Sequence, residues 1–374
     1  MSKILQVITI FLILNLLPGC INKSNLVEAE SKATDETSAQ IKIHYAKGFR
    51  AYYFEGGKFV EVLHPKTGEV LDQIVLIGSE SAVVPDSLKA IKSVKISLNT
   101  IASQSTTHVS FLDRIEVLDK LKAIGFAELV RNENARKLID SKKMANLSEG
   151  QQMNKEILID LRPELFFMYP FDQQSVEQIK MHVKTMLTTE YLETSPLAKA
   201  EWIKFFALFF NREEMANQLF DQIVNNYEKL VVFNKTNRSY FMNLPYNGIW
   251  DFPPANSYSV QLMSDAGMNY IFQQVEHDAN LAKTTEEVID QCIDTDFWII
   301  IAQRNVGFGV QDLINENYFY KEFRAVKLGN VVMCNTTVSD YFGDALLEPD
   351  KLLSDLTQVI YGTKDSTEYF YRLK

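Results

Sequence analysis

The chain has 374 residues and a formal net charge of −10, and 46% of its residues are hydrophobic while 23% are charged. This length predicts two lobes or domains, and the acidic balance excludes nucleic acid and anionic lipid headgroups as electrostatic partners. Three cysteines are too few for a disulfide scaffold, and five scattered histidines show no metal-binding spacing, so we expect neither a metal site nor a cofactor.

Residues 1–19 have the pattern of a secretory signal peptide. Lys3 precedes an apolar run that ends at Leu17, and a lipobox ending in Cys20 follows. The run is shorter than the roughly 20 apolar residues that cross a bilayer, so we expect cleavage before Cys20 and lipidation of its thiol. The protein would then be extracytoplasmic, either periplasmic or at the cell surface, and its lipid would anchor it to a membrane. A plain membrane anchor with an incidental Cys20 is the alternative.

The polar segment 20–40 is expected to be a flexible tether between the lipid and the fold. Short strand-like runs follow between residues 41 and 77, separated by turn signals such as Glu55-Gly56-Gly57-Lys58. The runs are Phe49–Phe54, Phe59–Leu63 and Val70–Ile77. They predict a small antiparallel β element at the start of an N-terminal lobe that covers residues 41–212.

Strand-like and helix-like segments alternate in the rest of this lobe. Repeated β-loop-α units of this kind predict a parallel sheet with helices on both faces. Strands are expected at residues 94–98, 165–169 and 181–185, a polar loop at 99–107, an amphipathic stretch at 109–124, and helices at 154–161 and 173–179.

One long bridging helix is expected at residues 213–230, where Met215, Leu219, Ile223 and Tyr227 recur at helical spacing. At 1.5 Å per residue it would be roughly 27 Å long, enough to connect two lobes, and a single stiff connection implies small relative motion. The C-terminal lobe repeats the alternation over residues 231–374, with strands expected at 240–244, 297–302 and 331–334 and a helix at 259–266.

Several short motifs occur in a defined order along the chain: Ser105-Thr106-Thr107-His108, Asn154-Lys155-Glu156-Ile157-Leu158, Leu161-Arg162-Pro163-Glu164-Leu165, Trp250 with Ser257-Tyr258, Asp265-Ala266-Gly267 and Glu348-Pro349-Asp350. Their order and spacing resemble those of the class III substrate-binding proteins of ABC importers, which capture cobalamin, ferric siderophores and haem. The resemblance implies two Rossmann-like lobes with central, mostly parallel sheets, joined by one long helix, with the ligand held between the lobes.

The loops after the predicted strands are expected to form the ligand site, because ligands of open α/β sheets lie beyond the carboxyl ends of the strands. These loops are rich in aromatic residues, whose rings bury apolar area while a hydroxyl or ring N–H can reach a polar edge. Arg304 could pair with an anionic siderophore oxygen or a haem propionate, or it could form an intramolecular salt bridge. The predicted ligand-binding residues are Thr107, His108, Tyr169, Tyr246, Trp250, Tyr258, Arg304 and Tyr341.

Some of these residues also have a structural interpretation. Trp250 could pack its loop against the lobe, Tyr258 opens a predicted helix, and Thr107 is a candidate N-cap. His108 could ligate a haem iron, although a lone histidine near the start of a helix more often caps or hydrogen-bonds.

The resemblance also implies how the protein docks on its transporter. In the family an exposed glutamate on each lobe pairs with arginines of the membrane permease, and Glu156 and Glu286 are expected to take these positions, with Glu287 as the near alternative. Two charges separated by the width of the cleft would orient the protein over a twofold permease mouth.

The sequence therefore predicts a monomeric, non-catalytic receptor that captures an iron-siderophore, or a related metal chelate or tetrapyrrole, and delivers it to an ABC permease. An exported hydrolase on an α/β fold is the alternative. A hydrolase needs a nucleophile with a base; Ser103, Ser105, His108 and Asp113 fall close together, but no G-x-S-x-G elbow occurs.

Two cysteines remain once Cys20 is assigned. Cys292 and Cys334 each lie beside an apolar strand-like run, where a buried free thiol is the commoner outcome, although an exported protein could pair them. The sequence leaves both outcomes open.

Overall fold

The computed structural model describes residues 41–374 except 151, 171–172, 233–236 and 276–278. The predicted signal peptide, the lipidated Cys20 and the tether at 20–40 lie outside the described residues. Within the described part of the chain, no helix is both long and apolar enough to cross a membrane.

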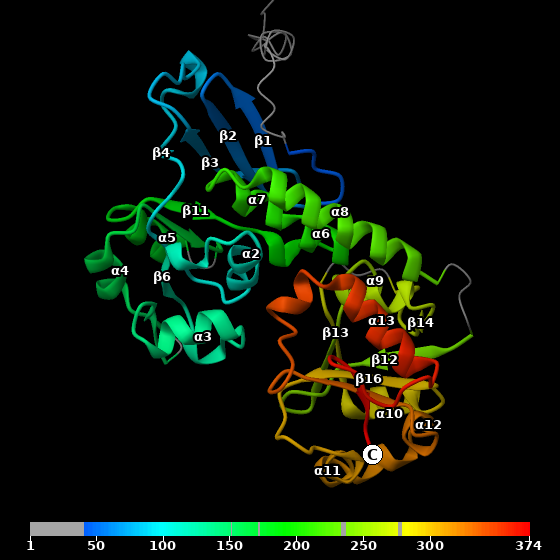
Figure 1. Cartoon of the computed structure of the whole chain (residues 1–374). Coiled ribbons are helices and arrows are strands. Elements are labelled where there is room, and N and C mark those ends of the chain that lie inside the picture. The colour runs from blue at the N-terminus through cyan, green and yellow to red at the C-terminus, as the bar shows by residue number, and fades with distance from the viewer. Residues whose placement is uncertain (1–40, 151, 171–172, 233–236, 276–278) are drawn as a thin grey trace, which may run out of the picture. The chain divides into compact units, whose positions relative to one another are not determined.

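A four-stranded sheet begins the described chain (Figure 1). Strands β1 (Phe49–Phe54), β2 (Gly57–Leu63) and β3 (Val70–Ile77) are antiparallel, and β4 (Ser93–Lys95) pairs with β3 in parallel. Gly56 has a φ of 75° in the turn between β1 and β2, a conformation that side chains with a Cβ rarely adopt. Alternate residues of β2 are buried because one face of this sheet packs on the N-terminal core.

Two buried carboxylates hold the segment that leads into β1. Glu201 accepts hydrogen bonds from the backbone N–H groups of residues 44–46, and Glu193 accepts them from residues 47 and 48. The lobe therefore holds this segment through its backbone N–H groups. The side chains of residues 44–48 do not make these contacts, so the sequence of the segment gives no signal for them.

The N-terminal lobe is built on a five-stranded parallel sheet with the strand order β11-β10-β5-β6-β7. Phe167 of the interior strand β10 packs against Phe206 and Phe209, with ring centroids 5.2 and 5.0 Å apart. The strands are β5 (Ile101–Ser103), β6 (Leu121–Ile124), β7 (Ala145–Asn146), β10 (Leu165–Met168) and β11 (Thr185–Leu187), and a separate antiparallel pair is formed by β8 (Ser148–Glu149) and β9 (Gln152–Met153). The helices are α2 (His108–Arg114), α3 (Glu133–Asp140), α4 (Lys155–Leu161), α5 (Gln173–Lys180), the 3-10 turn η5 (Glu190–Leu192), α6 (Pro196–Ala200) and α7 (Trp202–Leu208).

Several element predictions for this lobe were wrong. The predicted loop 99–107 contains β5, and the predicted amphipathic stretch 109–124 divides into α2 and β6. The strand expected at 94–98 belongs to the N-terminal sheet as β4, and the strand expected at 181–185 begins only at its last residue, as β11. A three-residue run such as β5 is too short to show a period in the sequence, and it becomes a strand because β6 and β10 pair with it on either side.

The C-terminal lobe has a second five-stranded sheet with the order β14-β12-β16-β17-β18, parallel except for β18 (Figure 1). Its strands are β12 (Ser239–Met242), β14 (Asn269–Tyr270), β16 (Phe297–Ala302), β17 (Val331–Asn335) and β18 (Tyr371–Arg372), and β13 (Ile249–Phe252) forms a separate antiparallel pair with β15 (Leu281–Thr284). The helices are α9 (Tyr258–Asp265), α10 (Thr285–Cys292), α11 (Val310–Glu316), η6 (Tyr318–Glu322), α12 (Arg324–Lys327), η7 (Asp344–Leu346) and α13 (Pro349–Ile360).

Helix α8 (Glu213–Leu230) contributes to the cores of both lobes, and its bounds equal those of the predicted bridging helix. Met215 and Leu219 pack against the N-terminal core, while Tyr227 lies in the C-terminal core and donates a 2.6 Å hydrogen bond to Asp265 Oδ2. The predicted fold class is thereby confirmed: two α/β lobes with mostly parallel sheets, one connecting helix and a small N-terminal β element.

Candidate functional site

Polar and aromatic side chains follow the carboxyl ends of the parallel strands in both lobes. Strands β5, β10 and β11 end at Ser103, Met168 and Leu187 in one lobe, and β16 and β17 end at Ala302 and Asn335 in the other. We call these strand ends and the segments after them the carboxyl edges, which is where ligands of open α/β sheets bind. They carry Gln104, Ser105, Thr107, Tyr169, Glu190, Tyr191, Arg304 and Tyr341.

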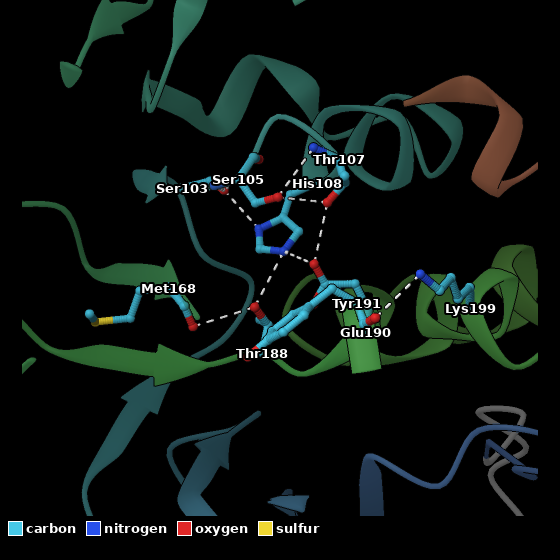
Figure 2. Close-up of polar contacts among 9 residues, drawn as sticks. All are labelled: Ser103, Ser105, Thr107, His108, Met168, Thr188, Glu190, Tyr191 and Lys199. Atoms are coloured by element: carbon cyan, nitrogen blue, oxygen red, sulfur yellow. Dashed lines mark hydrogen bonds and ion pairs between the residues drawn. The ribbon is translucent and has the colours of Figure 1, made fainter. Parts of the chain in front are cut away.

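His108 is the centre of a buried polar network at the N-terminal carboxyl edge (Figure 2). It is the first residue of α2, and none of its surface is exposed. Its Nδ1 lies 2.7 Å from Ser103 Oγ, and its Nε2 lies 3.1 Å from Glu190 Oε1 and 3.4 Å from Thr188 Oγ1. Because both ring nitrogens are engaged inside the protein, neither is available to a haem iron in this structure.

Glu190 and Lys199 place opposite charges beside this network. Burial raises the pKa of Glu190, but the charge and hydrogen bond of His108, a backbone hydrogen bond and the charge of Lys199 together lower it by more, so its net shift is downward. Burial lowers the pKa of Lys199, and the charge of Glu190 opposes that effect. Lys199 Nζ donates to the carbonyl of Tyr191 at 3.3 Å and lies 4.6 Å from the ring centroid of Tyr258, which belongs to the C-terminal lobe.

Ser103, His108 and Glu190 follow the order of hydroxyl, imidazole and carboxylate that occurs in catalytic triads. Ser103 is fully buried, however, and its hydroxyl lies 3.1 Å from the carbonyl oxygen of Ser105 as well as beside His108. No substrate can reach a hydroxyl in this position. The network instead holds the segments after β5 and β11 together.

Replacing Ser103 by alanine is expected to lower the free energy of unfolding by about 1–3 kcal/mol, because one nitrogen of the buried His108 loses its partner. Chemical denaturation measures this change. An ester hydrolysis assay on both proteins provides the control, since neither should turn over substrate. An esterase activity that disappears in the variant while stability stays the same would support the hydrolase alternative.

The structure places Thr107 and Tyr169 beside the segment after β11, and it places Tyr341 beside Tyr258. Thr107 Oγ1 lies 3.3 Å from Glu190 Oε1, and Thr107 does not cap α2 with its side chain. The ring of Tyr169 lies 6.1 Å from that of Tyr191. On the C-terminal side, burial and the neighbouring hydroxyl of Tyr258 raise the pKa of Tyr341.

Two further predicted ligand residues, Trp250 and Tyr246, lie in the stretch of chain that follows β12. Trp250 is in strand β13 rather than in a loop, and it is fully buried against Phe241, Phe252 and Trp298. Its ring therefore fills the C-terminal core, and a ligand cannot touch it in this structure. Tyr246 precedes β13 and is 82% exposed.

Arg304 forms the intramolecular salt bridge that the sequence offered as one of two possibilities. Its Nε lies 3.2 Å from Glu316 Oε1 and its Nη1 donates to the carbonyl of Gln303 at 3.0 Å. The guanidinium carbon also lies 5.5 Å from the ring centroid of Phe308. A ligand oxygen would have to compete with Glu316 for this cation.

Direct polar contacts join α2 of the N-terminal lobe to the segment after β17. Ser110 Oγ donates to Asp344 Oδ1 at 2.7 Å, and Arg114 pairs with Glu348. Nearby, burial raises the pKa of Asp340 to about 6, and the negative charges of Asp344 and Glu348 add to the effect. The C-terminal side of this contact thus carries three carboxylates, of which Glu348 also lies 3.5 Å from Lys351 Nζ.

Gln104, Glu190 and Lys199 were missed by the sequence prediction. Glu190 follows β11, so its place at the carboxyl edge would have been visible had the strand been expected at 185–187 rather than at 181–185. Lys199 lies on α6 and reaches the edge only through the packing of that helix, for which the sequence carries no local signal.

Glu156 and Glu286 occupy matching positions on the two lobes. Each is an exposed residue in the first turn of its helix, α4 or α10, behind an N-cap formed by Asn154 or Thr284. Glu287 completes the capping box of α10 by accepting the backbone N–H of Thr284 at 2.7 Å. Its carboxylate is therefore committed to the cap of α10.

Cys292 and Cys334 are both buried free thiols, so the structure contains no disulfide between them. Burial raises the pKa of each thiol to about 12, which makes both unreactive at neutral pH. In the described part of the chain, no cluster of three or more histidine, cysteine or acidic side chains could hold a metal ion.

No family model matches the sequence. An uncharacterized lipoprotein of Methanocaldococcus jannaschii is 24% identical over an alignment that covers 96% of this chain and 93% of that protein. Among solved structures, a periplasmic binding protein from Veillonella parvula superposes with a TM-score of 0.59 at 14% identity, covering 84% of this chain and 98% of that one. A periplasmic heme-binding protein from Pseudomonas aeruginosa gives a TM-score of 0.57 at 14% identity over 74% of this chain and 98% of its own.

The two α/β lobes with their parallel sheets thus define the fold to which this chain belongs. The chain has the fold of the class III substrate-binding proteins of ABC importers, as its sequence motifs implied. Both of these solved structures are binding proteins.

Proposed function

We propose that this protein is an extracytoplasmic substrate-binding protein, anchored to a membrane through the lipid on Cys20, that captures a metal chelate and passes it to an ABC permease. The candidate ligands are a ferric siderophore, haem and a corrinoid. The observation that carries the proposal is the meeting of the carboxyl edges of two parallel sheets: Ser110, on α2 after β5, donates a 2.7 Å hydrogen bond to Asp344 in the segment after β17. A ligand held there would contact both lobes at once.

The single connection through α8 supports this mode of binding. Because α8 is packed into both cores, the lobes can change their separation only a little without breaking the packing of Tyr227 and its bond to Asp265. Large, rigid chelates suit such a receptor, since they fill the space between two lobes without wide closure. Glu156 and Glu286 would then contact the permease, one from each lobe.

The test is a binding panel on the full-length protein purified in detergent. Equilibrium dialysis against ferric siderophores, haem and cobalamin is expected to find at least one chelate that binds. At a free concentration 100 times its Kd, that chelate should raise the free energy of unfolding by about 2.7 kcal/mol in thermal or chemical denaturation. Failure of every chelate to bind, together with turnover of an ester or peptide, would contradict the proposal.

A further inference from the structure

We infer that a short segment of the C-terminal lobe, residues 344–348, is a clasp that holds the two lobes together at their carboxyl edges and opens when a ligand enters or leaves. The clasp lies between β17 and α13 and contacts α2 of the N-terminal lobe. The inference adds a conformational device to the proposed function, and its main test needs no chelate.

The clasp passes from one hydrophobic core to the other within a few residues. Ala345 is fully buried in the core of the C-terminal lobe, whereas Leu347 is 3% exposed and belongs to the core of the N-terminal lobe. The reverse occurs on α6, where Leu197 belongs to the C-terminal core and Ala200 to the N-terminal core. Separating the lobes at the clasp would expose Leu347 to water, which is unfavourable in proportion to the apolar area uncovered.

Two polar contacts flank Leu347 and reach the same helix of the N-terminal lobe. The buried Ser110 donates its 2.7 Å hydrogen bond to Asp344 Oδ1, and Arg114 pairs with Glu348. The ion pair is partly exposed and contributes little by itself. Leu347 and the hydrogen bond of Ser110 are therefore expected to contribute most to the closed arrangement.

Each carboxylate of the clasp is also held by its own lobe. The backbone N–H of Asp344 donates to Asp340 Oδ2 at 3.2 Å, and the hydroxyl of Tyr369 donates to Glu348 Oε2 at 2.8 Å. These contacts remain when the lobes separate, and water can replace the lost contacts with α2. The exposure of Leu347 is thus the main effect that opposes opening.

The clasp is a second connection between the lobes, in addition to α8. Helix α8 is continuous chain packed into both cores, so it stays in place while the lobes tilt by a small angle. The contacts between the clasp and α2 are noncovalent and can break in the same movement. A ligand held between the carboxyl edges requires this, because a direct hydrogen bond between Ser110 and Asp344 leaves no room for a chelate there.

Pulsed electron–electron resonance on the full-length protein in detergent tests the clasp by measuring the distance between the lobes. Lys137→Cys on α3 and Gln311→Cys on α11 provide one exposed label site in each lobe. The two native cysteines of the described chain are buried and should not react, and lipidation blocks Cys20. A mass measurement verifies that each chain carries two labels.

Leu347→Ala is expected to raise the population with a longer distance between the lobes about tenfold, because it removes most of the apolar contact that favours closure. Leu353→Ala is the matched control: it makes the same change at a fully buried leucine of α13 that belongs to the C-terminal core alone. It should lower the stability of the protein and leave the distance unchanged. Equal distances in the wild type and Leu347→Ala, or the same lengthening in Leu353→Ala, would overturn the inference.

Ser110→Ala combined with Arg114→Ala provides a second measurement if Leu347→Ala folds poorly. The double variant removes both polar contacts of the clasp and keeps its apolar one. It is expected to raise the same population severalfold. In that case an unchanged distance would overturn the inference.

Haemin, cyanocobalamin and ferrioxamine B serve as probes of ligand entry. A probe that binds the wild type is expected to associate severalfold faster with Leu347→Ala, because a larger fraction of the molecules is open. An unchanged association rate would overturn the role of the clasp in entry and leave the proposed function standing. If none of the three probes binds, the proposed function loses its support, while the distance measurement still decides whether the lobes are clasped.

Discussion

Replacing Glu201 by alanine is expected to lower the free energy of unfolding by about 3–5 kcal/mol, because a buried ion pair loses one partner. Glu201 is fully buried, accepts the backbone N–H groups of residues 44–46, and receives Lys204 Nζ at 2.9 Å. Its removal leaves those donors unpaired and a buried ammonium without its carboxylate. Urea denaturation followed by circular dichroism measures the change.

Two further variants serve as controls for this prediction. Glu201→Gln keeps the shape and part of the hydrogen bonding, so its effect should be smaller than that of alanine. Glu214→Ala removes an exposed glutamate one helix away and should change the free energy of unfolding by less than about 0.5 kcal/mol. A similar stability for Glu201→Ala and Glu214→Ala would show that the docking of residues 44–46 contributes little to the fold.

The docking of this segment also bears on the proposed anchor. The N-terminal lobe holds the described chain from its first residues after the predicted tether. The backbone N–H of Ile41 donates to the Tyr53 hydroxyl at 3.0 Å, and Lys204 donates to the carbonyl of Lys42 at 2.7 Å. A force transmitted through the tether would therefore act on α7, which also carries Phe206, whose ring centroid lies 4.8 Å from that of His108.

Reversing the charges of Glu156 and Glu286 together, as Glu156→Arg with Glu286→Arg, is expected to reduce permease-dependent uptake tenfold or more. Each carboxylate would face an arginine of the permease, and the two reversed charges would convert attraction into repulsion. Uptake of the leading chelate into proteoliposomes that contain the permease measures the effect. The affinity of the isolated protein for the chelate should not change, because both residues are exposed and neither lies at a carboxyl edge.

Glu133→Arg is the matched control for this double variant. Glu133 is likewise an exposed first-turn glutamate behind an asparagine N-cap, on α3, so its reversal changes the same helix-end electrostatics without a predicted role in docking. Normal uptake by the double variant would contradict the docking proposal. Lost chelate affinity would place Glu156 or Glu286 in the binding site instead.

Long elements with a strong pattern were predicted well from the sequence. The bounds of β1, β3, β16 and α8 were predicted without error, since each is a continuous strand or helix pattern with clear turn signals at its ends. The candidate site was predicted only in part. Thr107, Tyr258 and Tyr341 lie at or near the carboxyl edges, but Trp250 is a core residue because β15 pairs with its strand and four aromatic rings surround it.

The amino-acid sequence by itself determined the two α/β lobes, the bridging helix and the likeness to class III binding proteins, because these depend on local periodicity and on the order of motifs. Only the tertiary structure decided which polar groups meet. Glu190 reaches His108 across 82 residues and Glu201 reaches His44 across 157, and no local pattern records such pairings. The charge and hydrogen-bonding character of the carboxyl edges depends on these long-range contacts, since burial and partner together decide whether an acidic group repels a ligand or accepts a bond from it.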